Sequence, residues 1–235
     1  MLMKLLELLY NHEKKYVEEI DRIEKNSEEV LFIEGKNDSG WICLKAPQNS
    51  FGWNITRLIG NIDDAKEALS KIPFDESVIL IDEGLDLSES SNIKRNNSLY
   101  FYENSVICDS NSYDYDLNNY LNSSDIYLPK GSIKQKASSL NSRIDDLYLI
   151  MKNLICGYIK VIKSTWHYSE LAIEINPEYR NQGFGTALMD IMNTQFSLKS
   201  QKFIYVVESD NIPSIKLANK FLRKSFVLDK YVYKK

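Results

Sequence analysis

The spacing of hydrophobic and polar residues changes along the chain, beginning with a helical period. Between residues 1 and 25 the apolar side chains recur at helical spacing, which predicts one amphipathic helix. These side chains are Leu2, Leu5, Leu6, Leu9, Tyr16, Val17, Ile20 and Ile23. Lys4 and Glu7 interrupt the apolar run and no small-residue cleavage site follows it, which argues against a targeting signal. Because the polar face carries acids as well as bases, we expect the helix to pack on the protein's own core, not on a membrane.

Short strand patterns replace the helical period after Lys25. The expected elements are a hairpin over 28–47, a strand over 51–60, a helix over 61–72 capped by Asn61, and a strand over 74–82. Residues 83–98 and 109–124 are rich in Ser, Asn and Asp, which predicts loops. We place a domain boundary near residue 115, so that residues 1–115 form an N-terminal accessory α/β region.

The second half alternates strands and helices more regularly. The expected elements are a hairpin over 146–163 with its turn at Lys152-Asn153, a strand over 169–176, a helix over 185–199, a strand over 202–209, a helix over 210–224 with Pro213 in its first turn, and a final strand over 226–234. This order predicts a layered α/β (α+β) fold for residues 116–235.

Composition restricts the classes of partner. The 235 residues include 29 basic and 33 acidic side chains, so the net charge is −4 and gives no electrostatic footprint for nucleic acid. Three widely separated cysteines show no disulfide or metal-ligand spacing, which suits the cytoplasm, and with two histidines we expect no metal site. No stretch is long and apolar enough to cross a bilayer, so we expect no membrane partner.

The strand over 169–176 carries candidate catalytic side chains. Alternation places Leu171, Ile173 and Ile175 on one face, and Glu170 and Glu174 on the other. Two such glutamates commonly mark a solvated sheet face. This strand, however, leads directly into a glycine-containing loop, where α/β folds place ligands. A partly desolvated glutamate there would have a raised pKa and could act as a general base near neutral pH.

The loop Arg180-Asn181-Gln182-Gly183-Phe184-Gly185-Thr186 is typical of an anion site at a helix start. Successive backbone N–H groups and the positive end of the helix dipole attract phosphate, and Arg180 and Thr186 can add contacts. A tight turn that needs glycine for its backbone angle alone is the competing interpretation. The loop is neither a dinucleotide fingerprint, because Leu188 occupies the third glycine position, nor a P-loop, because no Gly-Lys-Ser/Thr is present.

Two segments together resemble a known family. The segment R-N-Q-G-F-G over 180–185 resembles the R/Q-x-x-G-x-G/A signature of the GNAT superfamily of N-acetyltransferases. The segment from Asn211 to Lys220 is similar to the N-x-x-S-x-x-L-x-x-K helix of a GNAT subgroup that includes ribosomal-protein acetyltransferases. The resemblance covers roughly residues 115–235 and extends to the order of strands and helices. It implies the GNAT acyl-CoA N-acyltransferase fold for that half.

The resemblance also implies site residues. Gln182 to Thr186, with Arg180 and Asn181, would bind the pyrophosphate of acetyl-CoA. The strand over Ile173, Glu174 and Ile175 would pair with the pantetheine arm through its backbone, and Asn211 and Ser214 would contact the cofactor. Glu170 matches a strand carboxylate used as a base in parts of the family, and Glu174 stays an alternative base. The implied reaction is acetyl transfer to a primary amine of a small molecule or peptide, by a monomer or homodimer.

The sequence departs from the family in its last helix. Many relatives have a tyrosine there that protonates the departing thiolate, but the matching position is Ala218, or Phe221 in a shifted register. Water, Tyr231 or Tyr233 would have to replace it. A non-catalytic CoA-binding or protein-interaction module is therefore the alternative function. The first half has no glycine signature at the matching place, and its acidic Asp63-Asp64 would repel phosphate. We interpret it as a degenerate GNAT-like or otherwise accessory unit.

Overall fold

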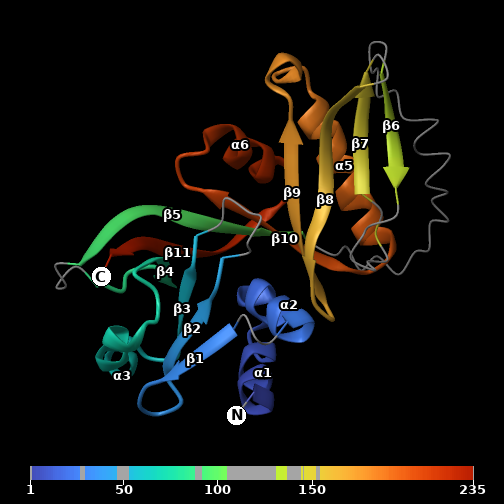
Figure 1. Ribbon diagram of the computed structural model, residues 1–235. Helices are drawn as coiled ribbons and strands as arrows, with labels where there is room; N and C mark the ends of the chain where they lie inside the picture. The colour runs from blue at the N-terminus through green and yellow to red at the C-terminus, as the bar shows by residue number, and fades with distance from the viewer. Residues whose placement is uncertain are drawn as a thin grey trace. The chain divides into compact units, whose positions relative to one another are not determined.

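The computed structural model describes residues 2–26, 30–46, 53–87, 92–104, 131–136, 144, 146–151 and 154–234 (Figure 1). The chain forms two compact units. Unit 1 consists of Met1–Phe101, Val207–Asn211 and Ser225–Lys235, and unit 2 of Tyr102–Val206 and Ile212–Lys224. The predicted boundary near residue 115 and the predicted loop over 109–124 fall outside the described residues, so the boundary stays a prediction. None of the described helices is long and apolar enough to span a membrane.

The predicted N-terminal helix of unit 1 is broken into two. Helix α1 (Leu2–Tyr10) and helix α2 (Val17–Asn26) are separated by the 3-10 turn η1 (Glu13–Lys15). The prediction of one continuous helix over 1–25 was wrong in this respect. The predicted apolar side chains do pack on the protein's own core: Leu5, Leu9, Tyr16 and Ile20 are buried with Ile42 and Leu44. The break lies in the polar stretch 11–15, which contributes no aliphatic side chain to that core.

The sheet of unit 1 confirms the predicted strands. Strand β1 (Val30–Glu34) pairs antiparallel with β2 (Gly40–Leu44), and β2 with β3 (Ile55–Ile59). Asn61 caps helix α3 (Ile62–Lys66), which continues as the 3-10 helix η3 (Glu67–Lys71) into β4 (Glu76–Asp82). Strand β4 is parallel to β3. The strand order is β1-β2-β3-β4-β11-β5, where β11 is Arg223–Lys234 and β5 is Ile93–Glu103. Figure 1 shows α1 and α2 on one side of β1–β3 and α3 on the other.

Two strands of unit 1 differ from the prediction. Strand β5 (Ile93–Glu103) begins inside the segment 83–98, which the polar composition predicted to be a loop. Strand β11 (Arg223–Lys234) begins three residues before the predicted start at 226 and pairs antiparallel with β4. Hydrogen bonds from distant residues explain β5: Ser98 donates its hydroxyl to Asp229 at 2.8 Å, and Ser209 N donates to Ser98 O at 2.8 Å.

The sheet of unit 2 has the strand order β10-β9-β8-β7-β6. Strands β7 (Asp146–Met151), β8 (Leu154–Ser164) and β9 (Tyr168–Ile175) form the predicted antiparallel meander. Helix α5 (Phe184–Leu198) then leads to β10 (Lys202–Glu208), which lies parallel to β9, and helix α6 (Ile212–Phe221) follows. Strand β6 (Gly131–Lys136) was not predicted, and the predicted turn at Lys152-Asn153 lies outside the described residues.

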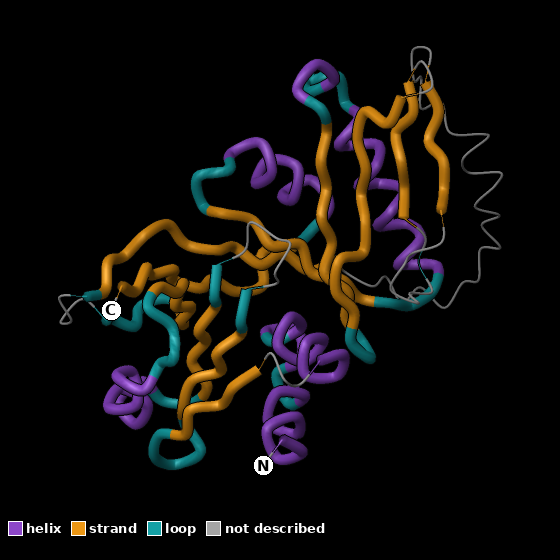
Figure 2. Tube along the Cα trace, in the orientation of Figure 1, coloured by secondary structure: helices purple, strands orange, loops and turns teal. Residues whose placement is uncertain are grey.

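The core of unit 2 lies between α5 and the meander. The predicted apolar face of α5, which comprises Leu188, Ile191, Met192 and Phe196, is fully buried. The rings of Phe196 and Phe203 of β10 meet edge to face, with centroids 4.8 Å apart. The tube in Figure 2 shows α5 running along β7, β8 and β9.

The two units share one order of elements. In unit 1, three antiparallel strands are followed by a helix and by a strand parallel to the third: β1, β2, β3, α3, β4. In unit 2 the same order is β7, β8, β9, α5, β10. The layout that a GNAT-like first half requires is therefore present in unit 1.

Candidate active site

Glu170 and Glu174 lie on the face of β9 that is turned away from α5. A Cβ added at Gly185 of α5 would lie 3.9 Å from Ile175 Cγ1 and 4.0 Å from Ile173 Cδ1, so these isoleucines point toward α5. Because side chains alternate along a strand, Glu170 and Glu174 point to the opposite face, as predicted. Their surroundings differ: Glu170 is 9% exposed, whereas Glu174 is exposed.

Glu170 forms an ion pair across the hairpin. Its Oε2 lies 3.2 Å from Lys163 Nζ of β8, and both side chains are largely buried. The two residues face one another because the register of β8 against β9 shifts between Val161 and Lys163. Such a bulge inserts one extra residue into one strand and re-aims the next side chain. The sequence shows no signal for the bulge, so Lys163 was missed as part of the site.

Glu174 accepts a hydrogen bond from the phenol of Tyr158, at 2.7 Å. This hydrogen bond is the main cause of a raised pKa at Tyr158, because ionising the phenol would lose the donor and place two anions together. Tyr158 therefore stays a hydrogen-bond donor to Glu174 well into the alkaline range. The two residues pair directly in the β8–β9 register. Counting back from the Ser164–Ser169 pair at the turn would have placed Ile175 opposite Tyr158, so the bulge also hid this pair from the sequence analysis.

Strands β9 and β10 diverge toward their carboxyl ends. Their parallel pairing ends at Leu171 and Tyr205, although β9 continues to Ile175 and β10 to Glu208. Asn176 N donates to Cys156 O of β8, so by alternation the N–H groups of Ile173 and Ile175 point away from β8, toward the gap. The predicted backbone positions for a pantetheine arm thus carry N–H groups that face a widening space.

The glycine loop follows the gap directly. Gly183 has φ +84°, the left-handed region that disfavours other residues, and a Cβ there would meet no atom within 4 Å. Asn181 is also left-handed, with φ +61°. Arg180 donates its Nε to Ile175 O at 2.9 Å, and Gln182 donates its amide to Glu178 O at 3.1 Å. Glycine is thus required by the turn, and the open space beside Gly183 also leaves room for a ligand.

Helix α5 begins with unpaired donors in this loop. Gly183 is its N-cap residue, and the first intrahelical bond runs from Ala187 N to Gly183 O at 3.0 Å. The N–H groups of Phe184, Gly185 and Thr186 therefore have no intrahelical acceptor. Phe184 is buried and anchors the turn, while Arg180, Asn181 and Gln182 are exposed around it. Three N–H groups at the positive end of a four-turn helix fit a phosphate.

The two polar residues predicted at the start of α6, Asn211 and Ser214, are assigned to different units. Ser214 belongs to unit 2, where it forms a hydrogen bond with the hydroxyl of Tyr205 on β10. Burial nevertheless raises the pKa of Tyr205 above its ordinary value. Asn211 is grouped with unit 1, and its N–H donates to Glu208 O at 2.9 Å. Tyr205 was not predicted, because a tyrosine in a buried strand is usually core.

Neither position of α6 that matches the missing tyrosine carries a hydroxyl. Ala218 is fully buried and Phe221 ends the helix, so neither can donate a proton. Tyr231 and Tyr233 belong to unit 1, where the Tyr231 hydroxyl donates to Leu85 O at 3.2 Å.

Unit 1 has a related divergence that its own chain fills. The parallel pairing of β3 and β4 ends at Arg57 and Leu80, although both strands continue. Tyr16 donates its hydroxyl to Leu58 O at 3.1 Å, and burial raises its pKa to about 12. Lys15 Nζ lies 2.6 Å from the Asp82 carboxylate of β4. Lys15 and Tyr16 therefore connect the two strands just past the point where their pairing ends.

The turn after β3 is also much shorter than the segment that carries the glycine loop. Three residues, 58–60, separate Arg57 from the N-cap Asn61, whereas eleven, 172–182, separate Leu171 from the N-cap Gly183. The Asn61 side chain accepts from Asp63 N at 2.8 Å, which occupies one of the helix-start donors. Asp63 and Asp64 in the first turn of α3 then place negative charge where an anion would bind.

Among the residues that the structure describes, no group of three or more His, Cys, Asp or Glu side chains is placed to hold a metal ion.

Comparison with known proteins agrees with this geometry. Residues 125–222 match the model of the acetyltransferase (GNAT) family. No curated protein sequence matches the chain. Among solved structures, a GCN5-related N-acetyltransferase from Kribbella flavida superposes with a TM-score of 0.59 at 9% identity, covering 94% of this chain and 95% of that one.

Two further structures show the same fold. A GCN5-related N-acetyltransferase-like protein from Streptococcus suis has a TM-score of 0.52 at 12% identity, covering 94% of this chain and 99% of that one. A tandem GNAT protein from the clavulanic acid biosynthesis pathway has a TM-score of 0.53 at 11% identity, covering 98% and 93%. Residues 125–222 are therefore similar in sequence to the acetyltransferase (GNAT) family, and the mixed α/β fold of the chain is like that of solved GNAT proteins over most of its length.

Proposed function

We propose that this protein is an N-acetyltransferase that uses acetyl-CoA to acetylate a primary amine of a small molecule or peptide. One observation carries the proposal: the diverging β9 and β10 open directly onto the unpaired N–H groups at the start of α5. Acetyl-CoA joins an extended pantetheine arm to a pyrophosphate. It would therefore need the gap between the strands and the N–H groups of the helix start side by side. Bound acetyl-CoA would supply the acetyl group as a thioester, which an amine cleaves with release of the thiol.

Each part of unit 2 has a role in this proposal. The N–H groups of Phe184, Gly185 and Thr186, with the guanidinium of Arg180, bind the pyrophosphate. The N–H groups of Ile173 and Ile175 hold the extended arm, and a donor there stabilises negative charge on the carbonyl oxygen during attack. Glu170 or Glu174 takes the proton that the amine loses as its nitrogen bonds to the acetyl carbon. The thiolate takes its proton from water in this scheme.

A thermal-shift comparison tests the cofactor first. Acetyl-CoA and CoA are expected to raise the melting temperature of the full chain, while NAD and ATP at equal concentration do not. Release of free thiol from acetyl-CoA across a panel of amines then separates the enzyme from the alternative, a non-catalytic CoA-binding module, which the fully buried Ala218 favours. Stabilisation without thiol release on any amine would support that module. Equal shifts with NAD or ATP would contradict both.

Two glycine substitutions form a matched pair within the loop. Gly183→Ala is expected to cost about 1–2 kcal/mol of stability, because alanine is strained at φ +84°, and to weaken acetyl-CoA binding roughly tenfold. In Gly185→Ala the new Cβ lies 3.7 Å from Leu217 Cδ2, an ordinary contact on the inner side, so binding is retained. Isothermal titration of both variants checks this. Equal affinity in the two variants would contradict the loop assignment.

The chain is expected to bind one acetyl-CoA, although it contains two units of like order. Lys15 and Tyr16 fill the divergence in unit 1, and the short turn before α3 lacks a pyrophosphate loop. Isothermal titration should therefore give a stoichiometry of one per chain, and Gly183→Ala should weaken that single site. Two sites per chain would show that unit 1 also binds the cofactor.

A further inference from the structure

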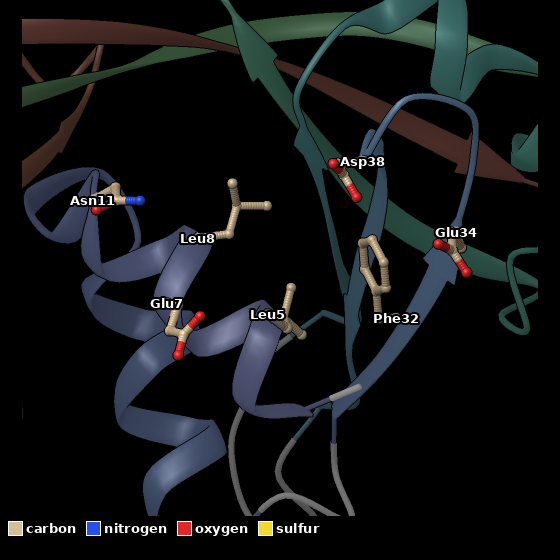
Figure 3. Close-up of a pocket in the computed structure, with 7 residues that line it drawn as sticks. All are labelled: Leu5, Glu7, Leu8, Asn11, Phe32, Glu34 and Asp38. Carbon is tan, nitrogen blue, oxygen red and sulfur yellow. The ribbon is translucent and has the colours of Figure 1, made fainter.

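A groove in unit 1 lies outside everything assigned to acetyl transfer. It runs between α1 and the hairpin of β1 and β2, and it has a volume of about 240 Å³. Figure 3 shows Leu5 and Leu8 of α1 facing the hairpin, with the ring of Phe32 and the carboxylate of Asp38 opposite them. All the residues that line the groove belong to unit 1, so its shape depends on that unit alone.

The floor of the groove is apolar and firmly supported. Leu5 is buried in the core that α1 shares with the sheet, and Leu8 and Phe32 pack against the same core while remaining partly accessible. Phe32 pairs with Ile42 across the hairpin, which holds its ring on the side of α1. The floor can therefore take an apolar body, with one aromatic ring in its wall.

The rim of the groove is acidic. Glu7, Glu34 and Asp38 are exposed on it, with the neutral Asn11, and among the described side chains no lysine or arginine lines the groove. Lys36, the nearest base in the hairpin turn, pairs with Glu67 at 2.9 Å. Among the described side chains, none forms a hydrogen bond or an ion pair with the carboxylate of Glu7 or of Glu34. The groove thus presents negative charge above an apolar floor.

From this arrangement we infer that the groove binds a small organic cation, a protonated amine that carries an apolar body. The carboxylates attract the ammonium group, and the face of the Phe32 ring can add a cation–π contact. An anion would be repelled, a neutral ligand would leave Glu7 and Glu34 without a counter-charge, and a metal ion would gain nothing from Leu5 and Leu8. The volume lies just below the usual range for drug-sized ligands, which restricts the site to small amines.

Three small probes separate the contributions of charge and apolar area. Phenethylammonium carries both, 2-phenylethanol keeps the body without the charge, and methylammonium keeps the charge without the body. Isothermal titration on the full chain, without acetyl-CoA, should detect phenethylammonium, with affinity at least about fivefold above either partial probe. Added salt should weaken the binding of phenethylammonium, because the carboxylates are exposed. Amide chemical-shift changes should fall on residues 5–11 and 32–38.

Substitutions then place the site. Glu7→Gln with Glu34→Gln is expected to lower the affinity for phenethylammonium at least about fivefold. Glu83→Gln, which removes an exposed acid of unit 1 outside the groove, should leave the affinity unchanged. Phe32→Leu should weaken binding while keeping the floor apolar. Unaltered melting temperatures show that each variant is folded.

Several outcomes would overturn the inference. Equal binding of 2-phenylethanol would show that charge has no part, and shifts located outside the groove would place the ligand elsewhere. Equal loss of affinity in Glu83→Gln would indicate attraction to the net charge of the chain only. None of these measurements involves acetyl-CoA, so their failure is distinct from a failure of the proposed acetyl transfer.

Discussion

Substituting glutamine for Glu170 and Glu174 together is expected to lower kcat about 10²–10⁴-fold, the usual contribution of a general base. Glutamine keeps the shape of each side chain but cannot accept a proton. Both glutamates lie on the face of β9 turned away from α5, so acetyl-CoA binding along the gap should be retained. Thiol release measures kcat, and the thermal shift with acetyl-CoA shows that the cofactor site is intact.

The two single variants then assign the base. Glu170 is held in an ion pair with Lys163, whereas Glu174 is exposed and accepts from Tyr158. If Glu174 is the base, Glu174→Gln carries most of the loss and Tyr158→Phe also lowers kcat, because it removes the hydrogen bond that orients the carboxylate. If Glu170 is the base, Glu170→Gln carries the loss and Tyr158→Phe has little effect. Unchanged turnover in the double variant would refute both assignments and leave the cofactor proposal standing.

A matched control separates the effect of losing a negative charge from the effect of losing the general base. Glu178 is an exposed glutamate just before the glycine loop, outside β9. Glu178→Gln removes the same negative charge from unit 2 without altering the strand, so kcat is expected to stay within about twofold of the parent. A loss in Glu178→Gln equal to that in the β9 variants would point to a general effect of charge on amine binding.

Local patterns were sufficient to predict the segment from β9 to β10. Alternation along 169–176, the glycines at 183 and 185 and the apolar face of α5 are each set by neighbours in sequence, and the structure has all of them. The break between α1 and α2 was not predictable in this way. The interval from Leu9 to Tyr16 is compatible with one continuous helix, and contacts of Lys15 and Tyr16 with distant strands hold the turn.

The surroundings of the candidate base were likewise not predictable from the sequence. That Glu170 and Glu174 share a face follows from a period of two, but their different exposure does not. It depends on the bulge that brings Lys163 opposite Glu170, and on the pairing of Glu170 with Ile204 of β10. Tyr205 was missed for a similar reason: only the packing of α6 brings Ser214 to its hydroxyl.

The buried ion pair in unit 1 should have the largest effect on stability. Arg57 Nη1 lies 3.3 Å from Glu19 Oε1, and the two side chains are 4% and 1% exposed. Glu19→Gln leaves the guanidinium buried without its counter-charge, so the free energy of unfolding is expected to fall by about 3–5 kcal/mol. Urea denaturation of the full chain measures this change.

A second, exposed pair provides the control for this prediction. Lys36 and Glu67 lie 2.9 Å apart with 61% and 76% of their side chains exposed, so Glu67→Gln is expected to cost less than about 1 kcal/mol. Glu19→Gln combined with Arg57→Met should recover much of the loss, because no uncompensated charge then remains buried. A cost in Glu19→Gln no larger than in Glu67→Gln would contradict the prediction.

The same pair supports the segment that fills the divergence of unit 1. Arg57 Nη2 donates to Lys15 O, and its guanidinium lies over the ring of Tyr16, 4.9 Å from the centroid. Loss of the pair should therefore loosen Lys15 and Tyr16 from β3 and β4. The turn before α3 remains much shorter than the segment that carries the glycine loop, however, so acetyl-CoA stoichiometry in Glu19→Gln should stay at one. A second cofactor site in that variant would mean that Lys15 and Tyr16 alone keep unit 1 from binding.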